Sequence, residues 1–101
     1  MKEIAIVGVG FMGGCLAAAI KNSKWPVRVY GLDSDEENAS YILESGLVDE
    51  VITEIPEGVD LILLAVPTGD VPGWVAGLAD HAGIVVDIAS IKGAILGLVK
   101  E

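Results

Sequence analysis

The chain has 101 residues, of which 15 are acidic and 6 are basic, so its formal net charge is −9. This length corresponds to one domain with one core, and a hydrophobic share of 52% argues against intrinsic disorder. The acidic balance excludes a nucleic-acid partner, because an acidic surface repels phosphate backbones and no lysine or arginine cluster offsets that repulsion. The single cysteine, Cys15, excludes an internal disulfide and is typical of the reducing cytoplasm, where we expect the protein to reside.

The N-terminal stretch is uncharged from residue 4 to residue 20, so we considered it as a signal peptide or membrane anchor. Glu3 interrupts the basic region that a signal peptide needs. The glycines within the stretch also weaken an apolar helix, by about 1 kcal/mol each. We therefore expect neither a signal peptide nor a membrane partner.

Short apolar runs alternate with longer helical stretches along the chain. In order, we expect a strand over 4–7, a helix over 11–22, a strand over 27–30, a helix over 34–44, a weak strand over 48–55, a strong strand over 60–66, a helix over 70–79, a strand over 84–88 and the start of a further helix at 89–101. The helix over 34–44 is indicated by Ser34 or Asp35 as its N-cap and by Gly46 just beyond its end.

This alternation predicts the fold class. Continuous apolar strands separated by helices are typical of an α/β domain whose parallel sheet is covered on both faces. Because crossovers between parallel strands are right-handed, few topologies remain. We expect a Rossmann-type doubly wound sheet of about five strands in the order 3-2-1-4-5, and a flavodoxin-like order 2-1-3-4-5 is the alternative.

A glycine motif separates the first strand from the first helix. Residues 8–13 have the pattern G-x-G-x-x-G. Gly8 permits a tight turn, Gly10 lets a pyrophosphate approach the backbone, and Gly13 lets helix and strand pack closely. Backbone N–H groups around Phe11 and Met12, with the helix dipole, then meet the negative charge. The motif predicts a dinucleotide as partner, and the alternative is that these glycines only form a tight turn in a flavodoxin-like domain.

An acidic residue at the end of the second strand completes this pattern. Asp33 follows Gly13 by 20 residues, which suits an acceptor for the hydroxyls of the adenosine ribose. A 2′-phosphate would meet Asp33 and the acids at 35–37, and Arg28, the one cation nearby, lies within the strand. The cofactor is therefore predicted to be NAD, with NADP less favoured. The alternative role for Asp33 is a helix N-cap.

Five segments resemble the N-terminal nucleotide-binding domain of the prephenate and arogenate dehydrogenases of tyrosine biosynthesis, over essentially the whole chain. They are residues 7–14 (VGVGFMGG), 30–33 (YGLD), 46–49 (GLVD), 64–67 (LAVP) and 87–92 (DIASIK). The last is the most specific, because its Ser-x-Lys is less widespread than the glycine motif. Within it, Ala89 stands where the family usually has glycine.

The resemblance implies a function and further site residues. Members of the family oxidatively decarboxylate prephenate or arogenate and pass hydride to NAD or NADP. By resemblance, Val66 and Pro67 contact the cofactor, and Ser90 lies beside the reacting hydroxyl and the nicotinamide as a catalytic residue. The alternatives are that Ser90 caps the final helix and that Lys92 is a solvated charge.

The resemblance also implies which parts of the enzyme lie elsewhere. The family's catalytic histidine follows the Ser-x-Lys element, so His81 does not match it and is expected to be a surface loop residue. We expect residues 1–101 to be a dinucleotide-binding domain that is inactive alone, since a small-molecule substrate needs the family's C-terminal helical domain. No metal is expected, because no Cys/His/carboxylate cluster is present.

Two other functions stay open: a stand-alone NAD-sensing regulatory module, and a domain of a related hydroxyacid dehydrogenase or imine reductase. The closing segment 91–99 carries one charge in nine residues, so we expect it to form a homo-oligomer or to dock a separate helical domain. The alternative is that it folds back over the edge of the sheet and leaves a monomer. Cys15 is expected to be buried on the first helix, and Trp74 to line the cofactor cleft or a domain interface.

Overall fold

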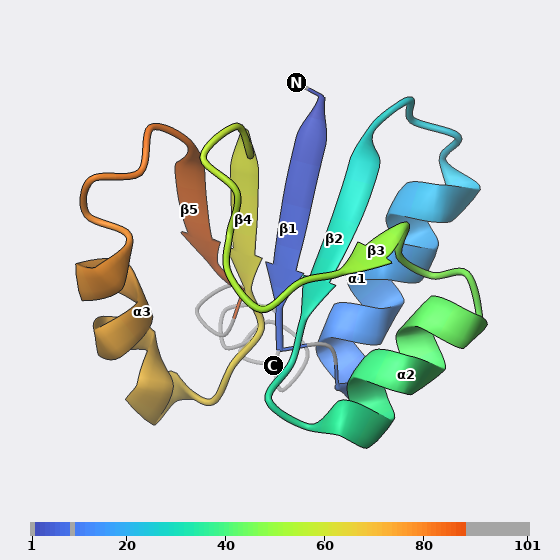
Figure 1. Ribbon diagram of the computed structural model, residues 1–101, viewed down its shortest axis with the longest axis horizontal. Coiled ribbons are helices and arrows are strands. Elements are labelled where there is room, and N and C mark those ends of the chain that lie inside the picture. The colour runs from blue at the N-terminus through green and yellow to red at the C-terminus, as the bar shows by residue number, and fades with distance from the viewer. Residues whose placement is uncertain (1, 9, 89–101) are drawn as a thin grey trace, which may run out of the picture.

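The computed structural model describes residues 2–8 and 10–88, which form a parallel sheet with helices on both faces (Figure 1). The strands are β1 (Glu3–Val7), β2 (Arg28–Leu32), β3 (Glu50–Val51), β4 (Leu61–Leu64) and β5 (Ile84–Asp87). Their order is β3-β2-β1-β4-β5, and every neighbouring pair is parallel. This confirms the predicted order 3-2-1-4-5 and excludes the flavodoxin-like alternative.

The helices divide between the two faces of the sheet. They are α1 (Phe11–Asn22), α2 (Glu36–Glu44), the short 3-10 turn η1 (Thr68–Asp70) and α3 (Val71–Gly77). Residues of α1 and α2 belong to the core on one face, whereas α3 and the segment after β3 pack against the other. Among the described residues, no helix is long and apolar enough to cross a membrane.

Two apolar clusters, one on each face, explain the continuous apolar runs of the strands. Side chains alternate along β1, so Ile4 and Ile6 enter one cluster while Ala5 and Val7 enter the other. The first cluster consists of Ile4, Ile6, Ala17, Val29, Ile42, Val48, Leu63 and Ile88. The second consists of Ala5, Val7, Tyr30, Val59, Ile62 and Leu64. A strand that is buried on both sides needs an apolar residue at every position.

The second and third strands differ from their predicted bounds. β2 continues through Gly31 to Leu32, and a Cβ on Gly31 would lie 2.6 Å from Cδ1 of Ile42. Glycine at this position therefore brings α2 close to the sheet. β3 has two residues rather than eight. Just before it, the Asp49 carboxylate accepts a hydrogen bond from the Val29 N–H (2.7 Å) in place of a strand backbone carbonyl, and after Val51 the chain passes over the sheet toward β4 (Figure 1).

Two smaller corrections concern the helices. α3 ends at Gly77 rather than at residue 79. Cys15 is exposed rather than buried, because α1 turns Gly13 and Ala17 toward the sheet and Cys15 away from it. The predictions for Val9, Ala89, Ser90, Lys92 and the closing segment 91–99 lie outside the described residues.

Candidate functional site

A tight turn at the carboxyl edge of the sheet follows β1. The Gly8 N–H donates to the Leu32 carbonyl (2.8 Å), and the Ala65 N–H donates to the Val7 carbonyl (2.8 Å), so the ends of β1, β2 and β4 are joined here. Gly8 has φ +81°, and a Cβ on it would lie 2.8 Å from the Ala65 carbonyl oxygen. Both the backbone conformation and the space therefore require glycine.

The turn leads directly into the N-terminus of α1. A Cβ on Gly13 would overlap the Gly8 carbonyl oxygen, so this glycine allows the helix to pack on the turn. Gly10 is the N-cap, and a Cβ placed on it meets no atom within 4 Å. The first N–H groups of a helix have no partner within the helix, and those of Phe11, Met12 and Gly13 are in this position. The site therefore offers backbone donors and a positive helix end behind open space, which suits an anion.

A cleft of ≈ 440 Å³ opens beside this turn. Its lining consists of Gly8, Leu32, Asp33, Ser34, Ile52, Thr53, Val66 and Trp74. Three of the predicted cofactor residues, Gly8, Asp33 and Val66, thus line one hollow. Gly10 borders a different hollow, of ≈ 420 Å³, between α1 and α2. Pro67 is exposed in the following loop, where its carbonyl accepts from the Asp70 N–H (2.8 Å).

Asp33 is the charged residue in the lining of the cleft. It follows β2 directly, and its Oδ1 accepts from the Asp35 N–H at 2.8 Å. The N-cap of α2 is Asp35, whose Oδ1 accepts from the Glu37 N–H at 2.9 Å. The alternative interpretation of Asp33 as the N-cap of α2 is therefore wrong, and Asp33 lines the cleft.

Arg28, the basic residue nearest to Asp33 in the sequence, lies at the opposite, amino edge of the sheet. Arg28 is the first residue of β2, four residues before its end, which corresponds to about 13 Å of strand. Its guanidinium contacts Glu50 (Nη2 to Oε1, 3.4 Å) and lies 5.4 Å from the centre of the Tyr30 ring. Tyr30, and after it Glu50 and Asp49, raise the pKa of Arg28 above its ordinary value. Arg28 is therefore engaged away from the cleft.

Sequence reasoning did not identify Leu32, Ser34, Ile52 or Thr53 as lining residues. The signal for Ile52 and Thr53 was available in the topology, because residues that follow a parallel strand reach the same carboxyl edge as the glycine turn. Trp74, which we expected at the cofactor cleft or at a domain interface, lines this cleft. Within residues 2–8 and 10–88, no group of three or more histidine, cysteine or acidic side chains converges on a metal site.

His81 is part of the scaffold. It lies in the loop before β5, as expected, and is partly exposed. Its Nδ1 accepts from the Gly83 N–H (2.9 Å), which leaves its Nε2–H to donate to the Pro56 carbonyl (3.2 Å). This histidine joins two loops at the amino edge of the sheet and does not line the cleft.

Comparison with known proteins places the chain in a family. Residues 16–101 match the family described as prephenate dehydrogenase, nucleotide-binding domain. Prephenate dehydrogenase from Bacillus subtilis (strain 168) is 29% identical over 100 residues, which cover 91% of this chain and 27% of that protein. The chain thus spans about a quarter of this relative's length. The family match begins after the glycine turn, so the turn and the match are separate observations.

Two solved dehydrogenase structures share the fold of this chain. Prephenate dehydrogenase from Aquifex aeolicus, in complex with hydroxyphenyl propionate and NAD+, is 29% identical with a TM-score of 0.76, and the match covers 84% of this chain and 32% of that one. Synechocystis arogenate dehydrogenase, at 23% identity and a TM-score of 0.72, shares the fold over 82% of this chain and 31% of its own. The family match extends over most of the sequence, and we conclude that the chain belongs to the family of prephenate dehydrogenase nucleotide-binding domains.

Proposed function

We propose that residues 1–101 are the NAD-binding part of a prephenate or arogenate dehydrogenase. The observation that carries this proposal is the carboxyl-edge cleft, in which Gly8, Asp33 and Val66 meet beside the N-terminus of α1. Ligands of open α/β sheets bind outside the carboxyl ends of the strands, where the strand order reverses. In this sheet the reversal lies between β1 and β4, at the glycine turn.

The described residues fit a dinucleotide. A pyrophosphate is expected at the N–H groups of Phe11, Met12 and Gly13, because the open space at Gly10 lets it reach the backbone. Asp33 supplies carboxylate oxygens for the hydroxyls of the adenosine ribose. Val66 supplies part of the apolar wall beside the turn, and Pro67 follows it in the same loop.

The charges around the cleft favour NAD over NADP. Asp33 lines the cleft, and Asp35, Glu36 and Glu37 follow at the start of α2. A 2′-phosphate on the ribose would face these carboxylates, whereas the Arg28 guanidinium lies at the other edge of the sheet. The unesterified 2′-hydroxyl of NAD instead donates a hydrogen bond to Asp33.

In the complete enzyme, NAD held at this cleft would supply the hydride acceptor for the oxidative decarboxylation. The residues described here bind and orient it. Ser90, which comes three positions after the last residue of β5 in the sequence, is proposed from the family resemblance as the catalytic residue that contacts the substrate hydroxyl. The substrate pocket itself is assigned to the further helical domain that the family implies, so we expect no turnover of prephenate or arogenate by the 101-residue polypeptide.

Calorimetric titration of the 101-residue polypeptide with NAD and with NADP tests this proposal. We expect NAD to bind at least roughly tenfold more tightly than NADP. The 2′-hydroxyl of NAD gains a hydrogen bond to the Asp33 carboxylate, whereas the 2′-phosphate of NADP is repelled by it. Asp33→Asn should narrow that ratio, and Asp80→Asn, which removes one negative charge from an exposed turn after α3, should leave it unchanged. Equal affinities in the parent polypeptide would remove Asp33 from its assigned role, and no binding of either dinucleotide would refute the proposal.

A further inference from the structure

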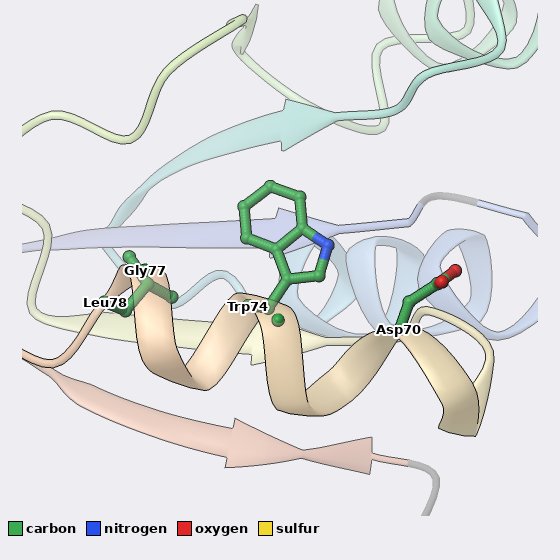
Figure 2. Close-up of a pocket in the computed structure, with 5 residues that line it drawn as sticks. Asp70, Trp74, Gly77 and Leu78 are labelled. Carbon is green, nitrogen blue, oxygen red and sulfur yellow. The ribbon is translucent and has the colours of Figure 1, made fainter.

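Trp74 is the large aromatic residue of the cleft, and its side chain packs against the second apolar cluster. α3 turns Val71, Trp74 and Leu78 toward the second apolar cluster, at the spacing of one helix face. Figure 2 shows the indole ring projecting from α3, with Asp70 toward one end of the helix and Gly77 and Leu78 toward the other. One part of the ring packs on the sheet, and another part remains accessible.

The accessible part of Trp74 lies between two hollows. One is the cleft that Gly8 and Asp33 also line, and the other is a hollow of ≈ 420 Å³ along α3 with Asp70, Gly73, Gly77 and Leu78. Gly73 and Gly77 carry no side chain, and a Cβ built on either would meet no atom within 4 Å, so this hollow is open at both glycines. Trp74 therefore packs against the second apolar cluster and also lines the cleft.

The positions of the basic side chains bear on how a dinucleotide could be held in the cleft. Of the basic residues in the described part of the chain, Lys2 precedes β1, Lys21 and Lys24 are at the end of α1, and Arg28 begins β2. All four lie at the amino edge, whereas the cleft is at the carboxyl edge and contains Asp33. Within residues 2–8 and 10–88, the cleft therefore offers a dinucleotide backbone donors, the Asp33 carboxylate and apolar surface rather than a basic side chain.

We propose that Trp74 is the aromatic wall against which the adenine of the dinucleotide packs. This inference rests on the proposed function, since Asp33 in the same cleft assigns the adenosine half, rather than the nicotinamide half, to this end. Adenine is the flat aromatic group of that half, and base–aromatic stacking contributes on the order of tenfold or more in affinity. Trp74 would then be a binding residue that favours adenine dinucleotides and tolerates other purines.

The chain carries its own control, because Trp25 lies at the other edge of the sheet. Trp25 is 45% exposed and borders a small hollow with Lys21, Val27 and Asp49, away from the glycine turn. Trp25→Phe leaves Trp74 as the single tryptophan, and Trp74→Phe leaves Trp25. We expect NAD and adenosine monophosphate to change the emission of Trp25→Phe and to leave that of Trp74→Phe unchanged. Nicotinamide mononucleotide should change neither.

Calorimetry with the same ligands measures the contribution of the ring. Trp74→Ala should weaken NAD binding by about tenfold or more, Trp74→Phe should retain most of the affinity, and Trp25→Ala should bind as the parent does. Circular dichroism of each variant identifies any that does not fold. If Trp74→Ala does not fold, the fluorescence emission of Trp25→Phe on addition of NAD remains as the test. Absence of NAD binding by the parent polypeptide would refute the proposed function. Unchanged binding by Trp74→Ala, or a response of Trp25→Phe to nicotinamide mononucleotide alone, would overturn the assignment of Trp74 while leaving the proposed function in place.

Discussion

The two edges of the sheet use their polar groups in opposite ways. At the amino edge, side chains close onto the backbone: the Asp60 carboxylate accepts from the N–H groups of Lys2 (2.8 Å) and Glu3 (3.0 Å), and the Lys21 ammonium donates to the Gly46 carbonyl (2.8 Å). At the carboxyl edge, the turn after β1 contains glycines, which have no side chain to cover the backbone. The first N–H groups of α1 have no partner within the helix, and an open cleft lies beside the turn.

This difference teaches where stability and binding are located. Polar groups that are paired within the chain contribute to folding and have little left for a ligand. Donors at the start of a helix are available to an anion, and their arrangement depends on how closely the helix packs on the strand. We therefore expect substitutions at the amino edge to change stability alone. Substitutions of glycines at the carboxyl edge should lower stability where the glycine lets the helix pack on the turn. They should lower ligand affinity where the glycine leaves space for the ligand.

The largest expected effect is that of Gly13→Ala. The added Cβ would overlap the Gly8 carbonyl oxygen, so α1 must move away from the turn. We expect the free energy of unfolding in urea to fall by about 1–3 kcal/mol and NAD binding to weaken with it. Gly14→Ala is the matched control, because its Cβ meets no atom within 4 Å and alanine favours a helix by up to about 1 kcal/mol. Equal stability of the two variants would contradict the packing role of Gly13.

Gly10→Ala should separate binding from stability. A Cβ at this N-cap enters open space, so the free energy of unfolding should change by less than about 1 kcal/mol. The same methyl group would occupy the position from which a pyrophosphate approaches the backbone. We expect NAD affinity to fall by roughly tenfold, equivalent to about 1.4 kcal/mol. Parent-like affinity in a calorimetric titration would place the pyrophosphate elsewhere.

The contrast between the edges also explains what the sequence could and could not predict. The strand order and the bounds of α1 follow from apolar periodicity and from the glycine turn, because both are local patterns. The length of β3 does not follow from such a pattern. The start of β3 depends on the Asp49 carboxylate accepting a hydrogen bond from the Val29 N–H, a contact between residues twenty positions apart.

The candidate site shows the same division. Gly8, Asp33 and Val66 belong to recognisable motifs and were predicted, and the cleft brings them together. Ile52 and Thr53 carry no motif, and they reach the cleft only because the chain passes over the sheet after β3 (Figure 1). The exposure of Cys15 likewise depends on which face of an almost wholly apolar helix meets the sheet, and periodicity alone does not decide that.

The smallest expected effect is at the amino edge and depends on pH. Hydrogen bonds from the backbone N–H groups of Lys2 and Glu3 lower the pKa of Asp60 below its ordinary value. A carboxyl group whose pKa is lower in the folded state stabilises the fold above its unfolded pKa, near 4, and that stabilisation is lost as the pH falls through the folded pKa. Asp60→Asn should therefore lower the Tm at pH 7, and the deficit should shrink as the pH approaches 3. Asp80→Asn is the control for the loss of one negative charge from an acidic chain.

NAD affinity should stay at the parent value in both variants, since neither residue lines the cleft. A Tm deficit that is the same at pH 7 and at pH 3 would show that the Asp60 carboxylate contributes by shape rather than by charge.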